Sequence, residues 1–284
     1  MNSDIQVRLA RPGDIPRVVR LLPGITRRPS QTQIYIVEKA GEFIGCGSLL
    51  FNSATDSAFS CNFITPENKS AGFTALFAAL LAEAEHQQMK TLMAHFGVAE
   101  DGPDSALLKS LGCREHIAFT YYETDLARGE ALFERSLSRL QKYKKIPPDV
   151  RVIPLEQAPA LPVQALWRES IGVGNDPLML QFEQQKFSPQ HSMVALDGPR
   201  VVGAIAINTS GEIPSAPYMA VETTYRGRWP YPLLMREAHA SLRRSGYSRV
   251  RFKTNPQHHP GLKNFAEKVD GKPCGREIFY IFEL

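Results

Sequence analysis

Ile64-Thr65-Pro66-Glu67-Asn68-Lys69-Ser70-Ala71-Gly72-Phe73-Thr74 is the stretch on which the interpretation of this chain rests. It predicts the end of a strand, a short polar loop and the start of an Ala/Leu-rich helix that runs on to Gln87. The first turn of a helix has backbone N–H groups without intrahelical partners and the positive end of the helix dipole. A glycine in that turn lets a ligand approach the backbone, so the stretch suits a phosphate or pyrophosphate group. A surface loop before an ordinary helix is the other interpretation.

Length and composition limit the class of protein. The 284 residues are 43% hydrophobic and 22% charged, which is typical of a globular chain with roughly 100–200 residues in each domain. No apolar run approaches the roughly 20 residues of a membrane span, and the N-terminus has no apolar signal region. The net charge of +4 is too small to indicate a nucleic-acid partner. The cysteines lack the paired spacing of a zinc site, which favours reduced thiols in a cytoplasmic protein: Cys46, Cys61, Cys113 and Cys274.

The first half of the chain is predicted to alternate strands and helices. A short strand at 7–10 precedes a helix with Asp14 as N-cap and Pro16 in its first turn. Strands at 34–38 and 43–50 are expected to form a hairpin, because both are apolar and a short glycine-containing turn joins them. The other elements expected here are a strand at 58–64, the helix after the opening stretch, a strand at 91–95, a short helix at 104–111 and a strand at 117–123.

A charged helical segment at 127–145, stopped by two prolines, is predicted to link this half to a second copy of it. Three pairs of landmarks lie 157 or 158 positions apart: Gly45 and Gly203, Lys69 and Arg226, and His95 and Lys253. The repeat predicts two copies of one β-α-β-β-β-α-β-α-β unit, each large enough to bury its own core. The expected ranges are a domain at 1–126, a linker helix at 127–149 and a domain at 150–284.

This order of elements resembles the GNAT superfamily of acyl-CoA-dependent N-acyltransferases, in tandem. The resemblance rests on Val7–Pro16, on the hairpin motifs Phe43-Ile44-Gly45 and Val201-Val202-Gly203, and on Lys69-x-x-Gly72-x-Thr74. The last motif is similar to the family's pyrophosphate loop, Gln/Arg-x-x-Gly-x-Gly/Ala. The resemblance implies an α+β fold with two consecutive GNAT-like domains, each a mixed, mostly antiparallel sheet flanked by helices.

The resemblance also implies a reaction, the transfer of an acetyl group from acetyl-CoA, a co-substrate, to an amine of a small-molecule or amino-acid-like acceptor. No metal is implied, and His258-His259 has no third ligand at a suitable spacing. Backbone N–H groups near Phe63 and Ile64 are expected to polarise the thioester carbonyl. We expect a monomer or a homodimer. The residues expected to bind the cofactor are Phe63, Ile64, Lys69, Ser70, Ala71, Gly72, Phe73 and Thr74.

The second copy departs from the family pattern at its loop. Trp229 stands where the first glycine belongs, and Pro230 and Pro232 have no N–H to donate. The first copy is therefore the expected cofactor site, and the second is expected to be a structural partner. The tyrosine with which the family often protonates the leaving thiolate is replaced by Leu108 in the first copy, and by Phe265 or Ala266 in the second.

His95 is the candidate catalytic base, because it ends the strand beside which the thioester is expected and its side chain can titrate near neutrality. A histidine held by its neighbours at a strand end is the other interpretation of this residue. Glu222 is the counterpart candidate in the second copy. A non-catalytic acyl-CoA-binding or regulatory protein is the alternative function, because neither copy has the expected tyrosine.

Overall fold

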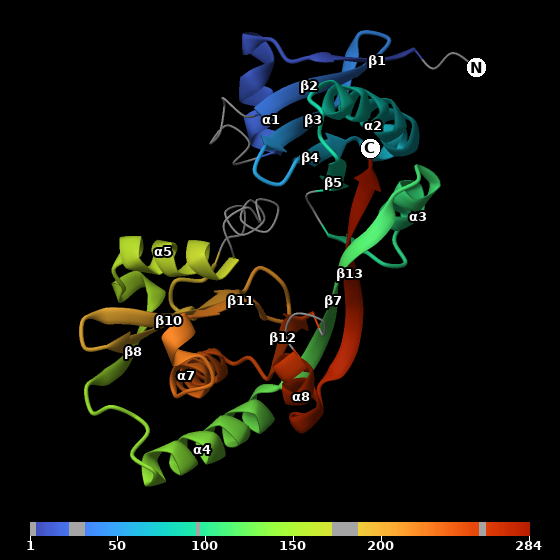
Figure 1. Cartoon of the computed structure of the whole chain (residues 1–284). Helices are drawn as coiled ribbons and strands as arrows, with labels where there is room; N and C mark the ends of the chain where they lie inside the picture. Colours follow the sequence, from blue (N-terminus) through green and yellow to red (C-terminus); the bar gives the residue numbers. More distant parts are fainter. Residues whose placement is uncertain (1–3, 23–31, 95–96, 172–186, 256–259) are drawn as a thin grey trace. The chain divides into compact units, whose positions relative to one another are not determined.

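The computed structural model describes residues 4–22, 32–94, 97–171, 187–255 and 260–284, which form two compact units (Figure 1). Among these residues, the first unit comprises those up to Ala118 together with Glu277–Leu284. The second unit comprises those from Phe119 to Arg276. The described helices include none that combines the length and the apolar character needed to cross a membrane.

The first unit is built on a mixed sheet with the strand order β1-β2-β3-β4-β5-β13. All neighbouring strands are antiparallel except β4 and β5, which run parallel. The two-residue strand β6 also pairs with β13. The strands are β1 (Ile5–Leu9), β2 (Thr32–Lys39), β3 (Glu42–Asn52), β4 (Ser57–Ile64), β5 (Thr91–Ala94), β6 (Val98–Ala99) and β13 (Lys272–Glu283), of which the last residues belong to this unit.

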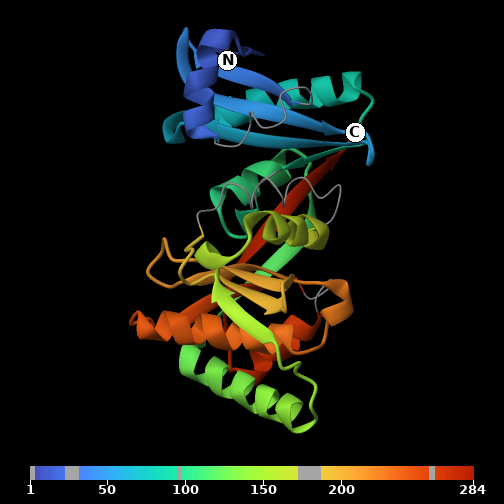
Figure 2. The same ribbon diagram turned by 90° about the vertical axis from the view of Figure 1, so that its left-hand side faces the viewer.

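Helices cover both faces of this sheet. Successive side chains of a strand point to opposite faces, so Ile36 on β2 packs with Val18 of α1, whereas Tyr35 and Val37 pack with Leu76 of α2. The turned view in Figure 2 shows α1 and α2 beside these strands. The helices are α1 (Ile15–Leu21), α2 (Lys69–His86) and α3 (Pro103–Ser110), and the 3-10 turns are η1 (Pro12–Asp14) and η4 (Pro66–Asn68).

The second unit repeats this arrangement, with the strand order β8-β9-β10-β11-β12-β7. Again the fourth and fifth strands, β11 and β12, are the parallel pair. The strands are β7 (Arg114–Asp125), of which the last residues belong here, β8 (Val150–Pro154), β9 (Met193–Asp197), β10 (Arg200–Asn208), β11 (Ser215–Val221) and β12 (Arg249–Thr254). The helices are α4 (Leu126–Lys142), α5 (Ala160–Ile171), α7 (Pro230–Arg244) and α8 (Pro260–Lys268), with 3-10 turns η5 (Leu155–Gln157) and η6 (Thr223–Tyr225).

The two hairpins carry the same irregularity, which confirms the repeat at the level of single residues. The register between β2 and β3 skips Ile44, and the register between β9 and β10 skips Val202. Each skipped residue directly precedes the glycine identified from sequence, Gly45 or Gly203. At Gly45 a Cβ atom would lie 2.5 Å from the carbonyl oxygen of Phe63. A glycine is therefore required beside this bulge, where the neighbouring strand comes so close.

The last strand of each half completes the sheet of the other unit. Near the C-terminus, Ile281 of β13 pairs with Met93 of β5 in the first unit. In the second unit, Tyr121 of β7 pairs with Lys253 of β12. The compact units are therefore not continuous in sequence, unlike the expected ranges 1–126 and 150–284. The physical reason is that the edge of a sheet offers the same N–H and C=O groups to any strand, so the repeat in the sequence does not determine which copy fills the position.

The linker helix predicted at 127–145 forms as α4 and belongs to the second unit. Asp125 caps it, because its side chain accepts a hydrogen bond of 3.0 Å from the backbone N–H of Arg128. Phe133 and Leu137 are buried in the core of the second unit. The polar face of α4 therefore explains its charged composition, and its apolar face anchors it.

Candidate functional site

The sheet of the first unit opens between its two parallel strands. The pairing of β4 with β5 ends at Ser60 and Ala94. On the other side, β4 stays paired with β3 as far as Ile64. The edge of β4 beyond Ser60 is consequently turned toward an opening in the sheet.

Strand geometry tells which backbone groups face this opening. The N–H of Thr65 donates to the carbonyl of Ile44 on β3, at 2.8 Å. Along a strand in an antiparallel pair, N–H groups point alternately to the two sides, so the N–H of Phe63 also points toward β3. The N–H groups of Asn62 and Ile64 then point toward the opening. Of the two positions expected from sequence to offer a donor, Ile64 has this orientation, and Asn62 adds a second donor that the sequence did not indicate.

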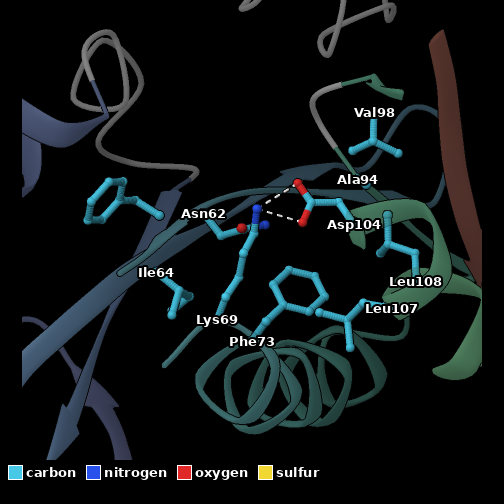
Figure 3. Close-up of a pocket in the computed structure, with 10 residues that line it drawn as sticks. Asn62, Ile64, Lys69, Phe73, Ala94, Val98, Asp104, Leu107 and Leu108 are labelled. Carbon is cyan, nitrogen blue, oxygen red and sulfur yellow. Dashed lines mark hydrogen bonds and ion pairs between the residues drawn. The ribbon is translucent and has the colours of Figure 1, made fainter. Parts of the chain in front are cut away.

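A cavity of about 300 Å³ lies at the opening (Figure 3). Its walls come from β4, from the first turns of α2, from the end of β5, from β6 and from α3. Most of the side chains are apolar, as is typical of sites that hold a small molecule. The lining residues are Asn62, Phe63, Ile64, Lys69, Phe73, Ala94, Val98, Asp104, Leu107 and Leu108.

Four of the residues expected from sequence line the cavity: Phe63, Ile64, Lys69 and Phe73. The other four, Ser70, Ala71, Gly72 and Thr74, lie in the first turns of α2 outside its lining. The resemblance pointed to α3 through Leu108, the position of the family's tyrosine, but two other lining residues of this helix, Asp104 and Leu107, were not expected. Helical periodicity identifies a helix but says nothing about which distant strand it will face, so Asp104 and Leu107 had no recognisable signal.

The predicted helix start is present, since α2 begins at Lys69 after the 3-10 turn η4. Some of its backbone donors are already used: the N–H of Asn68 bonds to the carbonyl of Thr65, and that of Lys69 to the carbonyl of Pro66. The carboxylate of Glu67 accepts hydrogen bonds from its own N–H and from Thr65, and both lower its pKa. The donors that remain as candidates for an anion are those of Ser70 and Ala71, because the N–H of Gly72, the fourth residue of α2, already bonds within the helix.

Gly72 has a packing role that the sequence did not reveal. It is buried, and a Cβ atom at this position would lie 2.9 Å from Cγ2 of Ile64 and 3.3 Å from Cδ1 of Ile44. The missing side chain lets α2 sit directly on β3 and β4. The close approach made possible by this glycine is therefore that of a helix to its sheet.

Lys69 and Asp104 form an ion pair at the edge of the cavity, as Figure 3 shows. The ammonium nitrogen of Lys69 lies 2.6 Å from Oδ1 and 2.9 Å from Oδ2 of Asp104. The two side chains are 45% and 39% exposed. An ion pair this exposed to water is worth at most about 1 kcal/mol, so it can be broken at low cost.

The candidate base, His95, lies outside the described residues. It directly follows Ala94, which lines the cavity. Leu108, at the position where the resemblance expects a tyrosine, is 3% exposed and lines the cavity with an apolar side chain. Phe265 and Ala266 are buried in the core of the second unit.

The loop of the second unit is closed by its own side chains. Trp229 directly precedes α7 and is only 2% exposed, within the main core of this unit. Tyr225 packs edge-on against it and donates a hydrogen bond of 2.7 Å to Asp197. Pro230 and Pro232 lie in the first turn of α7 and have no N–H. This start of a helix therefore offers an anion fewer donors than α2 does.

The opening between β11 and β12 is also occupied. Their pairing ends at Ala216 and Phe252. Just beyond it, the ammonium group of the buried Lys253 lies 5.1 Å from the ring centre of Tyr218 and 4.8 Å from that of Phe119. The other candidate here, Glu222, accepts hydrogen bonds from Arg200 and from the hydroxyl of Thr224.

Possible metal ligands do not gather in the described ranges: no group of three or more His, Cys, Asp or Glu side chains there could hold a metal ion. His258 and His259 lie outside these ranges.

Comparisons with known proteins agree with this geometry. No protein-family model and no curated protein matches the sequence. Among solved structures, a tandem GNAT protein from the clavulanic acid biosynthesis pathway is similar to this chain, with a TM-score of 0.58 and 16% identity. The match covers 98% of this chain and 98% of that protein. The chain has the tandem GNAT fold. A GCN5-related N-acetyltransferase of Sphaerobacter thermophilus is also similar, with a TM-score of 0.53 and 13% identity. This match covers 100% of the chain and 96% of that protein.

A third solved structure supports the same assignment. It is a GCN5-related N-acetyltransferase of Kribbella flavida, which matches 99% of the chain over 72% of its own, with a TM-score of 0.53 and 11% identity. At such identities the likeness concerns the fold. Within this tandem GNAT fold, the cavity lies in the first repeat, whereas aromatic side chains and prolines occupy the matching positions of the second.

Proposed function

We propose that the protein is an acyl-CoA-dependent N-acyltransferase that transfers the acetyl group of acetyl-CoA to an amine of a small-molecule or amino-acid-like acceptor. The observation that carries this proposal is the cavity at the opening between β4 and β5, with a lysine and a helix start at its edge. An apolar cavity suits the thioester arm, and a cation beside helix N–H groups suits a pyrophosphate. The fold supports the proposal because similar structures are described as N-acetyltransferases.

The reaction is a direct attack of the neutral amine on the thioester carbonyl. A nitrogen–carbon bond forms, the carbon–sulfur bond breaks, and the thiolate takes a proton to become the free thiol. The acceptor ammonium must first lose a proton, for which we propose His95 as the base. Backbone N–H groups of Ile64 and Asn62 are placed to stabilise the negative charge that develops on the carbonyl oxygen.

We assign cofactor binding to the first unit and a structural role to the second. In the first unit, Lys69 is exposed at a cavity. In the second, the buried Trp229 and two prolines occupy the equivalent helix start.

A non-catalytic acyl-CoA-binding or regulatory protein is the second candidate. Leu108 favours it, since this apolar side chain lines the cavity where a proton donor is expected. Solvent protonates a thiolate readily, however, so the missing tyrosine alone does not prevent turnover. We therefore keep the enzyme as the first candidate.

Calorimetric titration with acetyl-CoA tests both candidates. We expect binding by the wild type, a loss of about tenfold in affinity for Lys69→Ala, in which a charge-assisted contact to phosphate is removed, and no change for the matched variant Arg226→Ala. Equal losses in the two variants, or a loss in Arg226→Ala alone, would contradict the assignment to the first unit. The release of free thiol with a panel of amines then separates the two candidates, because only the enzyme releases thiol faster in the presence of an amine.

A further inference from the structure

The ion pair between Lys69 and Asp104 suggests how the second substrate is recognised. We propose that this ion pair is exchanged when the substrates bind. Lys69 binds the pyrophosphate of the thioester substrate, and Asp104, once released, binds the ammonium group of the acceptor. The proposal rests on the proposed function and names the charge of the acceptor, a primary or secondary ammonium.

The geometry of the pair carries the first step of the argument. Lys69 belongs to the first turn of α2, Asp104 to the first turn of α3, and both line the cavity. Both carboxylate oxygens of Asp104 lie within 2.9 Å of one ammonium nitrogen. The lysine therefore shows how Asp104 holds an alkylammonium group at the edge of the cavity. The amine acceptor of the proposed reaction carries the same chemical group.

The charge balance of the cavity carries the second step. Of the described residues that line it, only Lys69 and Asp104 have charged side chains. The thioester substrate brings several negative charges on its phosphates, and these compete with a single carboxylate for Lys69. Because the pair is half exposed, it changes an equilibrium constant by at most about a few-fold. The phosphates can therefore displace Asp104 from Lys69.

The released carboxylate then needs a cation. Leu107 and Leu108 lie on the same helix and line the same cavity. An unpaired carboxylate beside apolar side chains, and near bound phosphates, is unfavourable. A cationic acceptor removes this cost, whereas a neutral acceptor does not. Binding of the two substrates is therefore coupled, and the coupling must be reciprocal.

Asp104→Asn tests the exchange, with coenzyme A itself as the probe. The substitution frees Lys69 and removes a negative charge near the phosphates, so we expect calorimetry to show three- to tenfold tighter binding of coenzyme A. Asp101→Asn is the matched control, because it removes the same charge from an exposed turn outside the cavity lining, and it should leave the affinity within about twofold. Equal effects of the two substitutions, or no tightening in Asp104→Asn, would overturn the proposal.

The acceptor supplies an independent measurement. With the amine of highest turnover, Asp104→Asn should raise its KM at least tenfold and lower the KM of acetyl-CoA, whereas Asp104→Glu should restore part of the amine affinity. A purely structural role would instead change both KM values in the same direction and leave Asp104→Glu no better than Asp104→Asn. Failure of the wild type and Asp104→Asn to bind any coenzyme A would reject the proposed function and this proposal together. Binding without tightening rejects the exchange alone.

Discussion

Gly72 on α2 and Ile64 on β4 pack so closely that no side chain fits at position 72 without a shift of its neighbours. A Cβ atom at position 72 would lie 2.9 Å from Cγ2 of Ile64, a methyl group attached close to the backbone of a buried strand residue. The contact determines how α2 lies on the sheet, and with it the position of Lys69 and Phe73 at the cavity.

We expect Gly72→Ala to destabilise the protein, although alanine favours a helix. The gain in helix propensity is roughly 1 kcal/mol, whereas forcing an atom into a packed contact costs about 1–3 kcal/mol. Urea denaturation should therefore show a net loss of about 1 kcal/mol, and a larger loss for Gly72→Val. Gly13→Ala is the control, because a Cβ atom there has nothing within 4 Å. A more stable Gly72→Ala protein would show that α2 can shift away from β4 freely.

A substitution near the C-terminus should destabilise the core that supports the cavity of the first unit. Ile278 on β13 is fully buried in the same core as Leu76 and Leu108. Ile278→Ala is expected to cost about 2–5 kcal/mol, measured by urea denaturation, and to lower the affinity for acetyl-CoA. Lys272→Ala is the control, since it changes an exposed residue of the same strand. Unchanged cofactor binding in a destabilised Ile278→Ala protein would show that β13 does not support the site.

His239 should make the stability depend on pH. It is 1% exposed, and burial lowers its pKa from 6.5 to about 4. Between these values the unfolded chain binds a proton that the folded chain does not. The folded state therefore loses stability as the pH falls from about 6.5 to about 4, by roughly 3 kcal/mol in full.

The variant His239→Leu measures this contribution. The difference between its free energy of unfolding and that of the wild type should change by about 2 kcal/mol between pH 7.5 and pH 5, in favour of the variant at the lower pH. His86→Gln, which changes an exposed residue, should show no such change. A wild type and a His239→Leu protein with parallel pH profiles would mean that the folded protein accommodates the charged ring.

Thiol reactivity should distinguish one cysteine from the other three. Burial raises the pKa of Cys46 and of Cys113 to about 11, and raises that of Cys61 further, so these thiols are neither accessible nor ionised near pH 8. Cys274 is exposed. Titration with an aromatic disulfide reagent should thus show one fast thiol per chain, absent in Cys274→Ser, and four after denaturation. More than one fast thiol would indicate that the cores open readily. The same variant lowers the background in assays of thiol release.

Much of this fold could be predicted from local patterns in the sequence. Apolar runs joined by a short glycine-containing turn predicted the hairpin of β2 and β3, the Pro-Pro stop predicted the end of α4, and the spacing between Gly45 and Gly203 predicted the repeat. These features depend on neighbours a few positions apart, or on comparing one half of the chain with the other. The same information predicted the start of α2 and those expected cofactor residues, half of the set, that line the cavity.

The remaining features depend on contacts between distant residues. The exchange of β7 and β13, the packing of Gly72 on Ile64 and the ion pair of Lys69 with Asp104 each join residues that no local pattern relates. A sheet edge accepts any strand, and an exposed lysine accepts any carboxylate within reach, so only the folded chain decides which partner is present. The loop at Lys69 was recognisable from sequence as an anion-binding candidate, but its present partner, a carboxylate of the same chain, was decided by the tertiary structure.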